Sequence, residues 1–217
     1  IYGSETASTV RSRGIYHFPY DTSLLVYDDL QCSDLGNSVV NWGASPLRSY
    51  AMDTAADYSM GQFVWTGFDY IGEPTPYSTK NSYFGIVDTA GFEKDSFWFY
   101  KSVWDIACEK PFIHISPCYW DFNEGQMIDI IAYSNLPVLK LRYCGKIYDS
   151  ETLDHKSEDK LCAHFRVPYH KNSPVAVRGY YNENCTINDY AVEKVLFTSL
   201  DPYKMRMPSD RREITAD

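Results

Sequence analysis

The sequence has no hydrophobic run as long as a membrane span. A transmembrane helix needs about 20 consecutive apolar residues, and polar or charged residues interrupt every apolar stretch here well before that length. The usual metal-binding motifs are also missing, because no two of the six cysteines form a C-x-x-C pair and the five histidines form no H-E-x-x-H motif. We therefore predict no membrane-spanning segment, no metal site and no cofactor.

Positive charge is scarce in this sequence. There are 20 Lys and Arg residues against 29 Asp and Glu residues, which gives a net charge of -9 and a pI of about 5.0. Because nucleic-acid-binding domains present a basic patch to the phosphate backbone, this balance argues against a nucleic-acid partner. A starting methionine is missing as well, since the sequence begins at Ile1. Such a sequence could not display a signal peptide, so its compartment stays open, as does its oligomeric state.

Closely spaced cysteines are another missing feature. The six cysteines lie at positions 32, 108, 118, 144, 162 and 185, which does not suggest a compact disulfide scaffold. We expect free and mostly buried thiols. Aromatic residues, in contrast, are abundant, with a share of 16% that includes 19 tyrosines. Aromatic rings stack on sugars or bases in binding sites, and they also fill hydrophobic cores.

The first half of the chain, up to about residue 107, has an α/β pattern. Ser45 and Pro46 are typical of a helix start, and apolar residues follow at helical spacing as far as Met60. Residues 61–68 predict a buried strand, and a loop rich in Gly and Pro continues to about residue 94. A second helix is expected from Asp95, with these residues on one face: Phe97, Tyr100 and Trp104. Strand, loop and helix in this order indicate an α/β fold.

The second half has a β pattern. Apolar and polar residues alternate in several short segments, which predicts strands at 128–133, 139–143, 163–167, 175–181 and 192–197. Cys144 and Gly145 can form a tight hairpin turn, although cysteine is a poor occupant of a positive-φ position. Residues 149–160 are almost all polar and predict a surface loop. Short strands at this spacing suggest an antiparallel sandwich of about seven strands.

Two segments of the first half carry candidate functional residues. Gly3–Ser8 (GSETAS) has the pattern of a strand that presents a carboxylate, Glu5, at its C-terminal tip, although a Glu in such a setting is also common as a plain surface residue. Trp65–Tyr77 is dense in rings and carboxylates. Rings can stack on the apolar face of a pyranose while Asp and Glu accept hydrogen bonds from its hydroxyls. The alternative is a tightly folded loop whose rings fill the core.

These segments together resemble glycoside hydrolase family 2 enzymes of the β-galactosidase type. Residues 3–14 are similar to the family's nucleophile segment, and residues 61–74 (GQFVWTGFDYIGEP) are similar to its eighth barrel strand and following loop. Residues 85–104 resemble its last barrel loop and helix. The resemblance implies that residues 1–107 form the last strands and helices of a (β/α)8 barrel. Residues 108–200 then form an immunoglobulin-like β-sandwich, and residues 201–217 form a linker and the start of a further β-domain.

The resemblance also implies roles for individual residues. The family hydrolyses β-glycosides with retention of configuration, using a nucleophilic carboxylate and a second carboxyl group as acid/base. Glu5 matches the nucleophile, Trp65 matches a residue that floors the sugar site, and Asp69 and Glu73 match polar loop residues that bind substrate. A nucleophile must be ionised, so we expect hydrogen-bond donors around Glu5. The acid/base partner belongs to an Asn-Glu pair on an earlier barrel strand, whereas Asn182-Glu183 falls in the expected sandwich.

A barrel of this kind needs about 250 residues by itself, so 217 residues cannot also hold a sandwich. We therefore expect a portion of a retaining β-glycosidase that depends on the remainder of a parent chain and is inactive alone. Motif similarity favours a β-galactoside substrate over a glucuronide or a mannoside. The alternative is a non-catalytic carbohydrate-binding or structural module. A self-contained small enzyme is disfavoured, because no second carboxylate stands in a credible motif.

Overall fold

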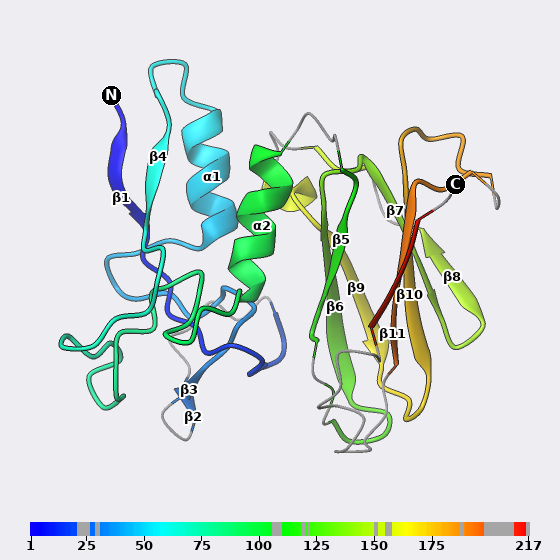
Figure 1. Cartoon of the computed structure of the whole chain (residues 1–217), viewed down its shortest axis with the longest axis horizontal. Coiled ribbons are helices and arrows are strands. Elements are labelled where there is room, and N and C mark those ends of the chain that lie inside the picture. Colours follow the sequence, from blue (N-terminus) through cyan, green and yellow to red (C-terminus); the bar gives the residue numbers. More distant parts are fainter. Residues whose placement is uncertain are drawn as a thin grey trace. The chain divides into compact units, whose positions relative to one another are not determined.

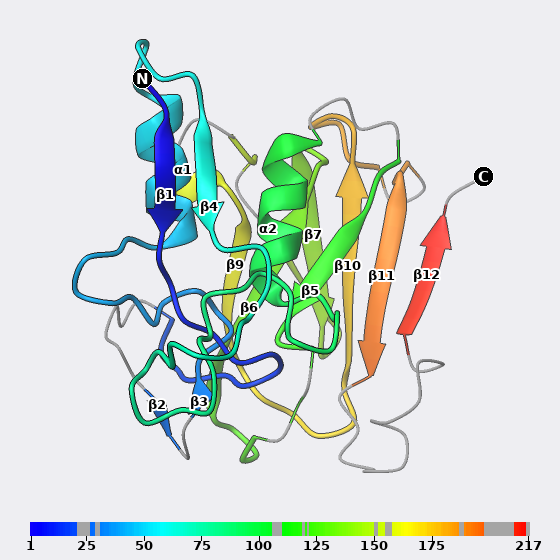
Figure 2. The same cartoon turned by 60° about the vertical axis from the view of Figure 1, so that its left-hand side comes forward.

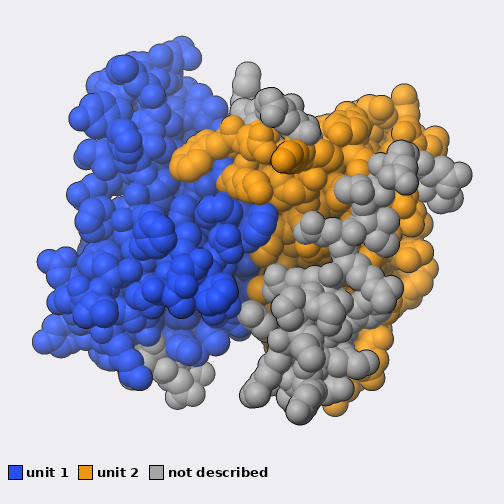
Figure 3. Space-filling view, in the orientation of Figure 1, with its two compact units in different colours: residues 1–100, 155–158 blue, residues 101–154, 159–217 orange. Residues whose placement is uncertain are grey.

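The computed structural model describes residues 1–20, 27–28, 31–105, 110–118, 120, 122–149, 152–154, 158–186, 189–197 and 211–215. Most of these residues lie in strands or loops, and the two α-helices are short (Figure 1). The described residues up to Tyr100, together with Glu158, form one compact unit, and the other described residues, from Lys101 onward, form a second unit (Figure 3).

The first unit contains one pair of parallel strands with a helix between them in sequence. Strand β1 (Gly3–Ala7) pairs with β4 (Gln62–Trp65), and α1 (Pro46–Thr54) contacts β1 (Figure 2). Strand β2 (Tyr27–Asp28) pairs with β3 (Gln31–Cys32) in antiparallel orientation. The predicted α/β pattern is therefore present as a single βαβ arrangement. The predicted end of a (β/α)8 barrel is not shown, because this is the one parallel strand pair among the described residues.

Helix α1 starts where the sequence predicted but ends earlier. The Ser45 side chain caps the helix by accepting a hydrogen bond from the Arg48 amide at 3.2 Å, and Pro46 occupies the first turn. The helix ends at Thr54. The apolar spacing predicted that it would continue past Tyr58, but Tyr58 is exposed in the turns that follow the helix. The residues that α1 buries are Pro46, Leu47, Tyr50 and Ala51.

Helix α2 (Asp95–Trp104) begins at the predicted residue, but its buried face differs from the expected one. Tyr100 is buried as predicted, whereas Trp104 is 55% exposed and Phe97 is half-buried. The helix buries Phe99, Tyr100 and Val103 instead. All of these residues are apolar and lie within two turns, so helical periodicity alone could not choose between the two faces.

The second unit consists of two antiparallel sheets. One sheet has the order β5-β6-β9 and the other the order β12-β11-β10-β7-β8. The strand bounds are β5 (Ile113–Ser116), β6 (Met127–Ser134), β7 (Val138–Tyr143), β8 (Lys146–Asp149), β9 (Ala163–Pro168), β10 (Pro174–Tyr180), β11 (Val192–Phe197) and β12 (Arg211–Thr215), with a 3-10 turn at Glu158–Lys160. The five strands predicted in this half agree with β6, β7, β9, β10 and β11 to within a residue or two.

The core of the second unit lies between these sheets. Strand residues of both sheets are fully buried, and β5 packs beside β10 and β11 of the other sheet. The buried strand residues include Ile115, Ile128, Ile130, Leu139, Leu141, Val167, Val175 and Val177. Gly179 on β10 is closely packed, because a Cβ there would lie 2.4 Å from Leu136 Cδ1. The alternating pattern of the sequence appears as alternating burial in β7 and β9, whereas β6 is buried along nearly its whole length.

The predicted hairpin turn is also present. Cys144 and Gly145 both have positive φ, 50° and 73°, and connect β7 to β8 where Tyr143 pairs with Lys146. Cys144 is exposed for this reason, while Cys32 is buried. All cysteines in the described part of the chain are free thiols, as expected, and Cys108 lies outside that part. The expectation that most are buried is wrong for the described cysteines, because Cys118, Cys162 and Cys185 are only partly buried.

Candidate active site

The two parallel strands β1 and β4 have one face against α1 and one face turned away from it. On the α1 side, the Thr6 hydroxyl donates to Gln62 Oε1 at 2.7 Å, and the Ser49 hydroxyl of α1 donates to the same oxygen at 3.0 Å. Thr6 pairs with Val64 across the two strands. Glu5, next to Thr6 in β1, is exposed and makes neither of these contacts with the α1 side.

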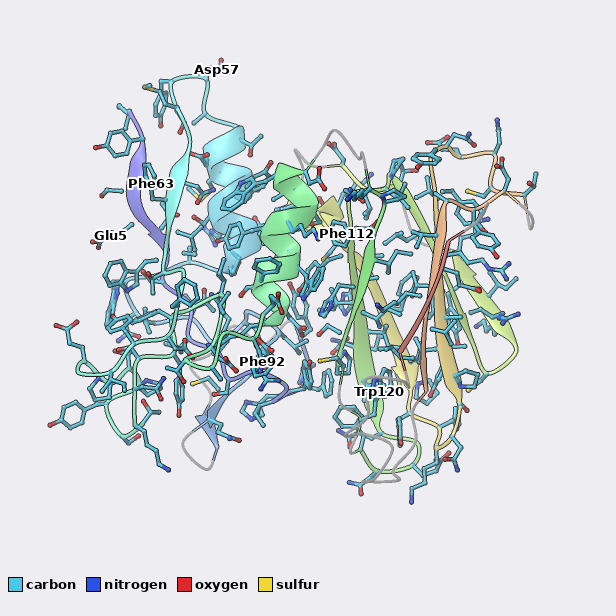
Figure 4. All side chains as sticks on the ribbon, viewed as in Figure 1. Glu5, Asp57, Phe63, Phe92, Phe112 and Trp120 are labelled. Carbon is cyan, nitrogen blue, oxygen red and sulfur yellow. The ribbon has the colours of Figure 1, made fainter. Side chains whose placement is uncertain are left out.

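Glu5 is exposed on the face turned away from α1. In Figure 4 its side chain lies on the side of β1 away from α1. The strand pairing is irregular between Gly3 and Thr6, so Glu5 lies within a bulge of β1 rather than at its last residue. The expected ring of donors is not seen, because no described residue donates a hydrogen bond to the Glu5 carboxylate. The described part of the first unit therefore positions Glu5 through its strand alone.

The end of β1 is held by a close backbone contact. Ala7 and Ser8 have positive φ, 69° and 53°, and turn the chain out of the strand. The Ala44 amide donates to the Ala7 carbonyl at 2.6 Å. Gly43 comes so close that a Cβ there would lie 2.5 Å from the Ser8 carbonyl oxygen. The glycine thus allows the loop before α1 to fix the C-terminal end of the strand that carries Glu5.

Trp65 ends β4 and stands beside the end of β1, where it pairs with Ala7. Its ring is partly buried against a cluster formed by Val10, Cys32, Val40 and Phe84. Tyr70 meets it edge to face, with ring centroids 6.0 Å apart and an interplanar angle of 80°. Trp65 and Glu5 therefore lie on neighbouring strands and near the same strand ends.

Asp69 is placed differently from an open substrate-binding residue. Its side chain is 6% exposed, and its Oδ1 accepts hydrogen bonds from the Lys94 ammonium at 2.7 Å and from the Gly85 amide at 2.8 Å. Lys94, whose side chain is fully buried, also donates to the Arg11 carbonyl at 2.6 Å. Burial raises the pKa of Asp69 and lowers the pKa of Lys94, and their mutual contact opposes both shifts.

Two further ionisable residues, Arg11 and Asp34, are buried in the same unit. Arg11 is fully buried and donates to the Ser96 hydroxyl at 2.6 Å and to the Thr9 carbonyl at 2.9 Å. Asp34 is 1% exposed, and burial together with the nearby Asp95 carboxylate raises its pKa to about 8. A carboxyl group with such a pKa is largely neutral at pH 7.

Glu73 and Glu183 lie apart from this cluster. Glu73 is exposed in the loop between β4 and α2, so it is accessible as the prediction for a substrate-binding residue requires. Glu183 follows β10 in the second unit, where it accepts a hydrogen bond from Thr152 at 3.2 Å. Asn182-Glu183 therefore lies just after β10, within the half of the chain that the sequence predicted to form a sandwich.

Sequence reasoning did not identify Arg11, Asp34 or Lys94. The only local signal is the position of Lys94 directly before the start of α2, and nothing in the sequence indicates that its ammonium is buried. No group of three or more His, Cys, Asp or Glu side chains that could hold a metal ion occurs among the described residues. In that same portion, no helix has both the length and the apolar character needed to cross a membrane.

Comparisons with known proteins point to one group of enzymes. No family model matches the sequence. The chain is 34% identical to the β-galactosidase BoGH2A of Bacteroides ovatus, over 99% of this chain and 25% of that protein. It is 30% identical to a putative β-glucuronidase of Formosa agariphila, over 80% of this chain and 16% of that protein. The chain thus spans about a quarter or less of the length of these relatives.

Solved structures show the same fold. A β-glycosidase from Bacteroides vulgatus superimposes with a TM-score of 0.70 at 21% identity, over 91% of this chain and 27% of that chain. β-Glucuronidase 3 from Bacteroides uniformis superimposes with a TM-score of 0.58 at 15% identity, over 92% of this chain and 30% of that chain. At these identities the similarity establishes the fold shared by the chains.

Proposed function

Because the chain belongs to glycoside hydrolase family 2, we propose that it is part of a retaining β-glycosidase in which Glu5 is the catalytic nucleophile. The observation that carries this proposal is the position of Glu5 and Trp65. They lie on adjacent parallel strands, near ends that are in register at Ala7 and Trp65, and Glu5 is on the face away from α1. Active sites of barrel enzymes lie at the C-terminal ends of parallel strands.

In this proposal, the Glu5 carboxylate attacks the anomeric carbon of the glycoside and forms a glycosyl-enzyme, which water then hydrolyses. Trp65 supplies an apolar floor for the sugar ring, supported from below by its packing cluster and by Tyr70. Glu73, exposed in the adjoining loop, accepts hydrogen bonds from sugar hydroxyls. Asp69 contributes to substrate binding by shaping this loop, since its carboxylate oxygen is held by Lys94 and the Gly85 amide.

For the substrate we propose a terminal β-galactoside. The support is the 34% identity to a β-galactosidase over nearly the whole chain, compared with 30% identity to a putative β-glucuronidase over a smaller part. The acid/base carboxyl group is expected outside this chain, on an earlier strand of the parent protein. The chain by itself should therefore not hydrolyse glycosides, because a retaining mechanism needs both carboxyl groups about 5 Å apart.

We extend the proposal to the domain organisation. Residues 1–107 would correspond to the C-terminal part of a (β/α)8 barrel, residues 108–200 to an immunoglobulin-like domain, and residues 201–217 to a linker and the start of a further β-domain. The boundary between the two compact units after Tyr100 is close to the first of these divisions. The separation of β5, β6 and β9 from β7, β10 and β11 follows the division of immunoglobulin strands A, B, E from C, F, G.

The test uses the complete parent protein and the isolated chain side by side. Nitrophenyl β-galactoside, β-glucuronide and β-mannoside are offered to the parent protein, its Glu5→Gln variant and the 217-residue chain. We expect release of nitrophenol from the galactoside by the parent protein, a loss of more than about a thousandfold in kcat for Glu5→Gln, and no release by the isolated chain. Unchanged turnover in Glu5→Gln would instead favour a non-catalytic carbohydrate-binding or structural role for this region.

A further inference from the structure

The strand that carries Glu5 and the strand that carries Trp65 are both short, and their pairing is irregular. The register links Gly3 to Gln62, then Thr6 to Val64 and Ala7 to Trp65, with an irregularity in between. Four or five residues of parallel pairing with a bulge fix two side chains less firmly than a long regular ladder does. The segments that follow each strand must therefore contribute to the separation of Glu5 from Trp65.

Lys94 joins these two segments. Its ammonium donates to the backbone carbonyl of Arg11, four residues beyond the end of β1, at 2.6 Å. The same ammonium donates to the carboxylate of Asp69, four residues beyond the end of β4, at 2.7 Å. The side chains of Lys94 and Asp69 are 0% and 6% exposed, so water does not compete for either contact.

The backbone of Lys94 is itself well fixed. Its amide donates to the Ile86 carbonyl at 2.9 Å, and its carbonyl accepts from the Phe97 amide at 3.0 Å as the first turn of α2 forms. The Asp69 side is fixed as well, because its carboxylate accepts from the Gly85 amide and its own amide donates to the Val87 carbonyl at 2.9 Å. The ammonium thus connects the Arg11 carbonyl with the Asp69 carboxylate, and the backbones of Lys94 and Asp69 are themselves hydrogen-bonded in place.

From this geometry we propose that Lys94 is a positioning residue, whose buried ammonium sets the placement of Glu5 relative to Trp65 by tying the segment after β1 to the segment after β4. This inference rests on the proposed function for its catalytic consequence. Lys94 itself does not touch substrate. A displacement of about 1 Å in such a site can lower turnover about a hundredfold. Loss of the Lys94 contacts is therefore expected to have a large effect on turnover, although Lys94 does not touch the reacting atoms.

The test compares four forms of the complete parent protein. Lys94→Met removes the ammonium while keeping the length of the side chain, and Lys94→Arg restores a cation. The double variant Asp69→Asn/Lys94→Met removes both charges, so that no unpaired charge remains buried. Lys80→Met is the matched control, because Lys80 is an exposed lysine of the same loop. Crystal structures, melting temperatures, kcat and KM are measured for each form.

We expect Lys94→Met to shift Glu5 relative to Trp65 by about 1 Å and to lower kcat about a hundredfold with a smaller change in KM. The double variant should recover melting temperature but not kcat, Lys94→Arg should recover part of kcat, and Lys80→Met should match the unmodified protein. An unchanged separation of Glu5 from Trp65 in a folded Lys94→Met variant overturns the inference. So does a kcat that recovers together with the melting temperature in the double variant.

These outcomes can be told apart from a failure of the proposed function. If the unmodified parent protein hydrolyses no β-glycoside, the proposed function fails, while the crystal structure of Lys94→Met still measures the separation of the two side chains. A shift in that structure supports the positional tie independently of any activity, and its absence refutes the tie.

Discussion

Each of the two units of the chain is stabilised internally by a different kind of interaction. The second unit has a core of aliphatic and aromatic side chains between two antiparallel sheets, and its strands follow the alternating pattern of the sequence. The first unit has short strands, long loops and an interior that contains these buried ionisable groups: Arg11, Asp34, Asp69, Lys94 and Asp95. Burying charge is costly unless each group has partners. The stability of the first unit therefore depends on the geometry of its hydrogen bonds and ion pairs, whereas the stability of the second depends mainly on the apolar area it buries.

This difference has a functional meaning. A site that must hold a nucleophile and an aromatic floor in a fixed relation gains from directional contacts, which hydrogen bonds and ion pairs supply and hydrophobic packing does not. The second unit also buries the carboxylates of Asp129 and Glu193, but their cationic or imidazole partners reach solvent. The side chains of His164 and Arg166, the partners of Asp129, are 36% and 43% exposed, and that of Arg178, the partner of Glu193, is 25% exposed. In the first unit, in contrast, Lys94 is fully buried and contacts the segments that follow the strands of Glu5 and Trp65.

The largest effect is expected at Gly85 in the first unit. A Cβ at this residue would lie 2.1 Å from the Asp69 amide nitrogen and 2.5 Å from the Val87 carbonyl oxygen, both of which are backbone atoms that cannot swing aside. Gly85→Ala should therefore separate Asp69 from its amide donor and destabilise the first unit by about 4 kcal/mol or more. Urea unfolding followed by hydrogen exchange in segments 62–70 and 83–94 measures this loss.

Two other glycines provide matched controls. Gly67 has no atom within 4 Å of its potential Cβ, so Gly67→Ala should change stability by less than about 0.5 kcal/mol. Gly179 in the second unit meets side-chain ends rather than backbone, with Leu136 Cδ1 at 2.4 Å, so Gly179→Ala should cost about 1–3 kcal/mol through overpacking. A cost at Gly179 equal to that at Gly85 would contradict the contrast between the two units.

The contrast also explains what the sequence could predict. In the second unit, alternation and turn residues placed five strands and the Cys144-Gly145 hairpin correctly, because the pattern that buries apolar side chains is local. In the first unit, the start of α1 followed from Ser45 and Pro46, again a local signal. Glu5 and Trp65 were found through family resemblance, and their placement on paired strands was not readable from spacing.

The buried charges could not be predicted for a physical reason. Lys94 contacts Arg11 and Asp69, which are 83 and 25 residues away in the sequence. Lysine and aspartate side chains are exposed in most proteins. Their burial costs free energy unless a partner in the folded structure pairs with the charge, and that partner is not visible in the sequence. The same limit applies to Asp69, which looked like a loop residue open to substrate and is instead held by a lysine and a backbone amide.

Asp34 gives the next largest expected effect, through pH. Its pKa is raised from 3.8 to about 8, chiefly by burial, and its Oδ1 has no hydrogen-bond partner among the described residues. The folded state thus keeps a proton that the unfolded state releases above pH 4, so this group's contribution to stability is lost as pH rises from about 4 to about 8. Asp34→Asn, which carries a neutral amide of similar shape, should remove this loss.

The measurement is the free energy of unfolding at pH 5.5 and pH 8.5 for both forms. Relative to the unmodified chain, Asp34→Asn should gain about 2–3 kcal/mol between these two pH values. The acceptor for the Gly14 amide, which lies 3.1 Å from Asp34 Oδ2, is retained in the amide side chain. Parallel pH profiles for the two forms would show that Asp34 is ionised in the folded first unit.

The smallest effect is expected where the first unit uses charge at the surface. Arg13 contacts Asp88 at 2.7 Å with side chains 32% and 17% exposed, whereas Arg166 in the second unit contacts Asp129, whose side chain is 1% exposed, at 2.8 Å. Since partly exposed ion pairs contribute about 0–1 kcal/mol, Arg13→Gln should cost less than about 1 kcal/mol. Arg166→Gln should cost more, because it removes a partner from a buried carboxylate. Urea unfolding at low and at high salt measures both costs and their screening. A cost for Arg13→Gln close to that for Gly85→Ala would mean that ionic contacts stabilise the first unit wherever they lie. A small cost for Arg13→Gln beside a larger cost for Arg166→Gln would instead assign the effect to burial of the carboxylate, since a buried carboxylate that loses its partner has no solvent to replace it.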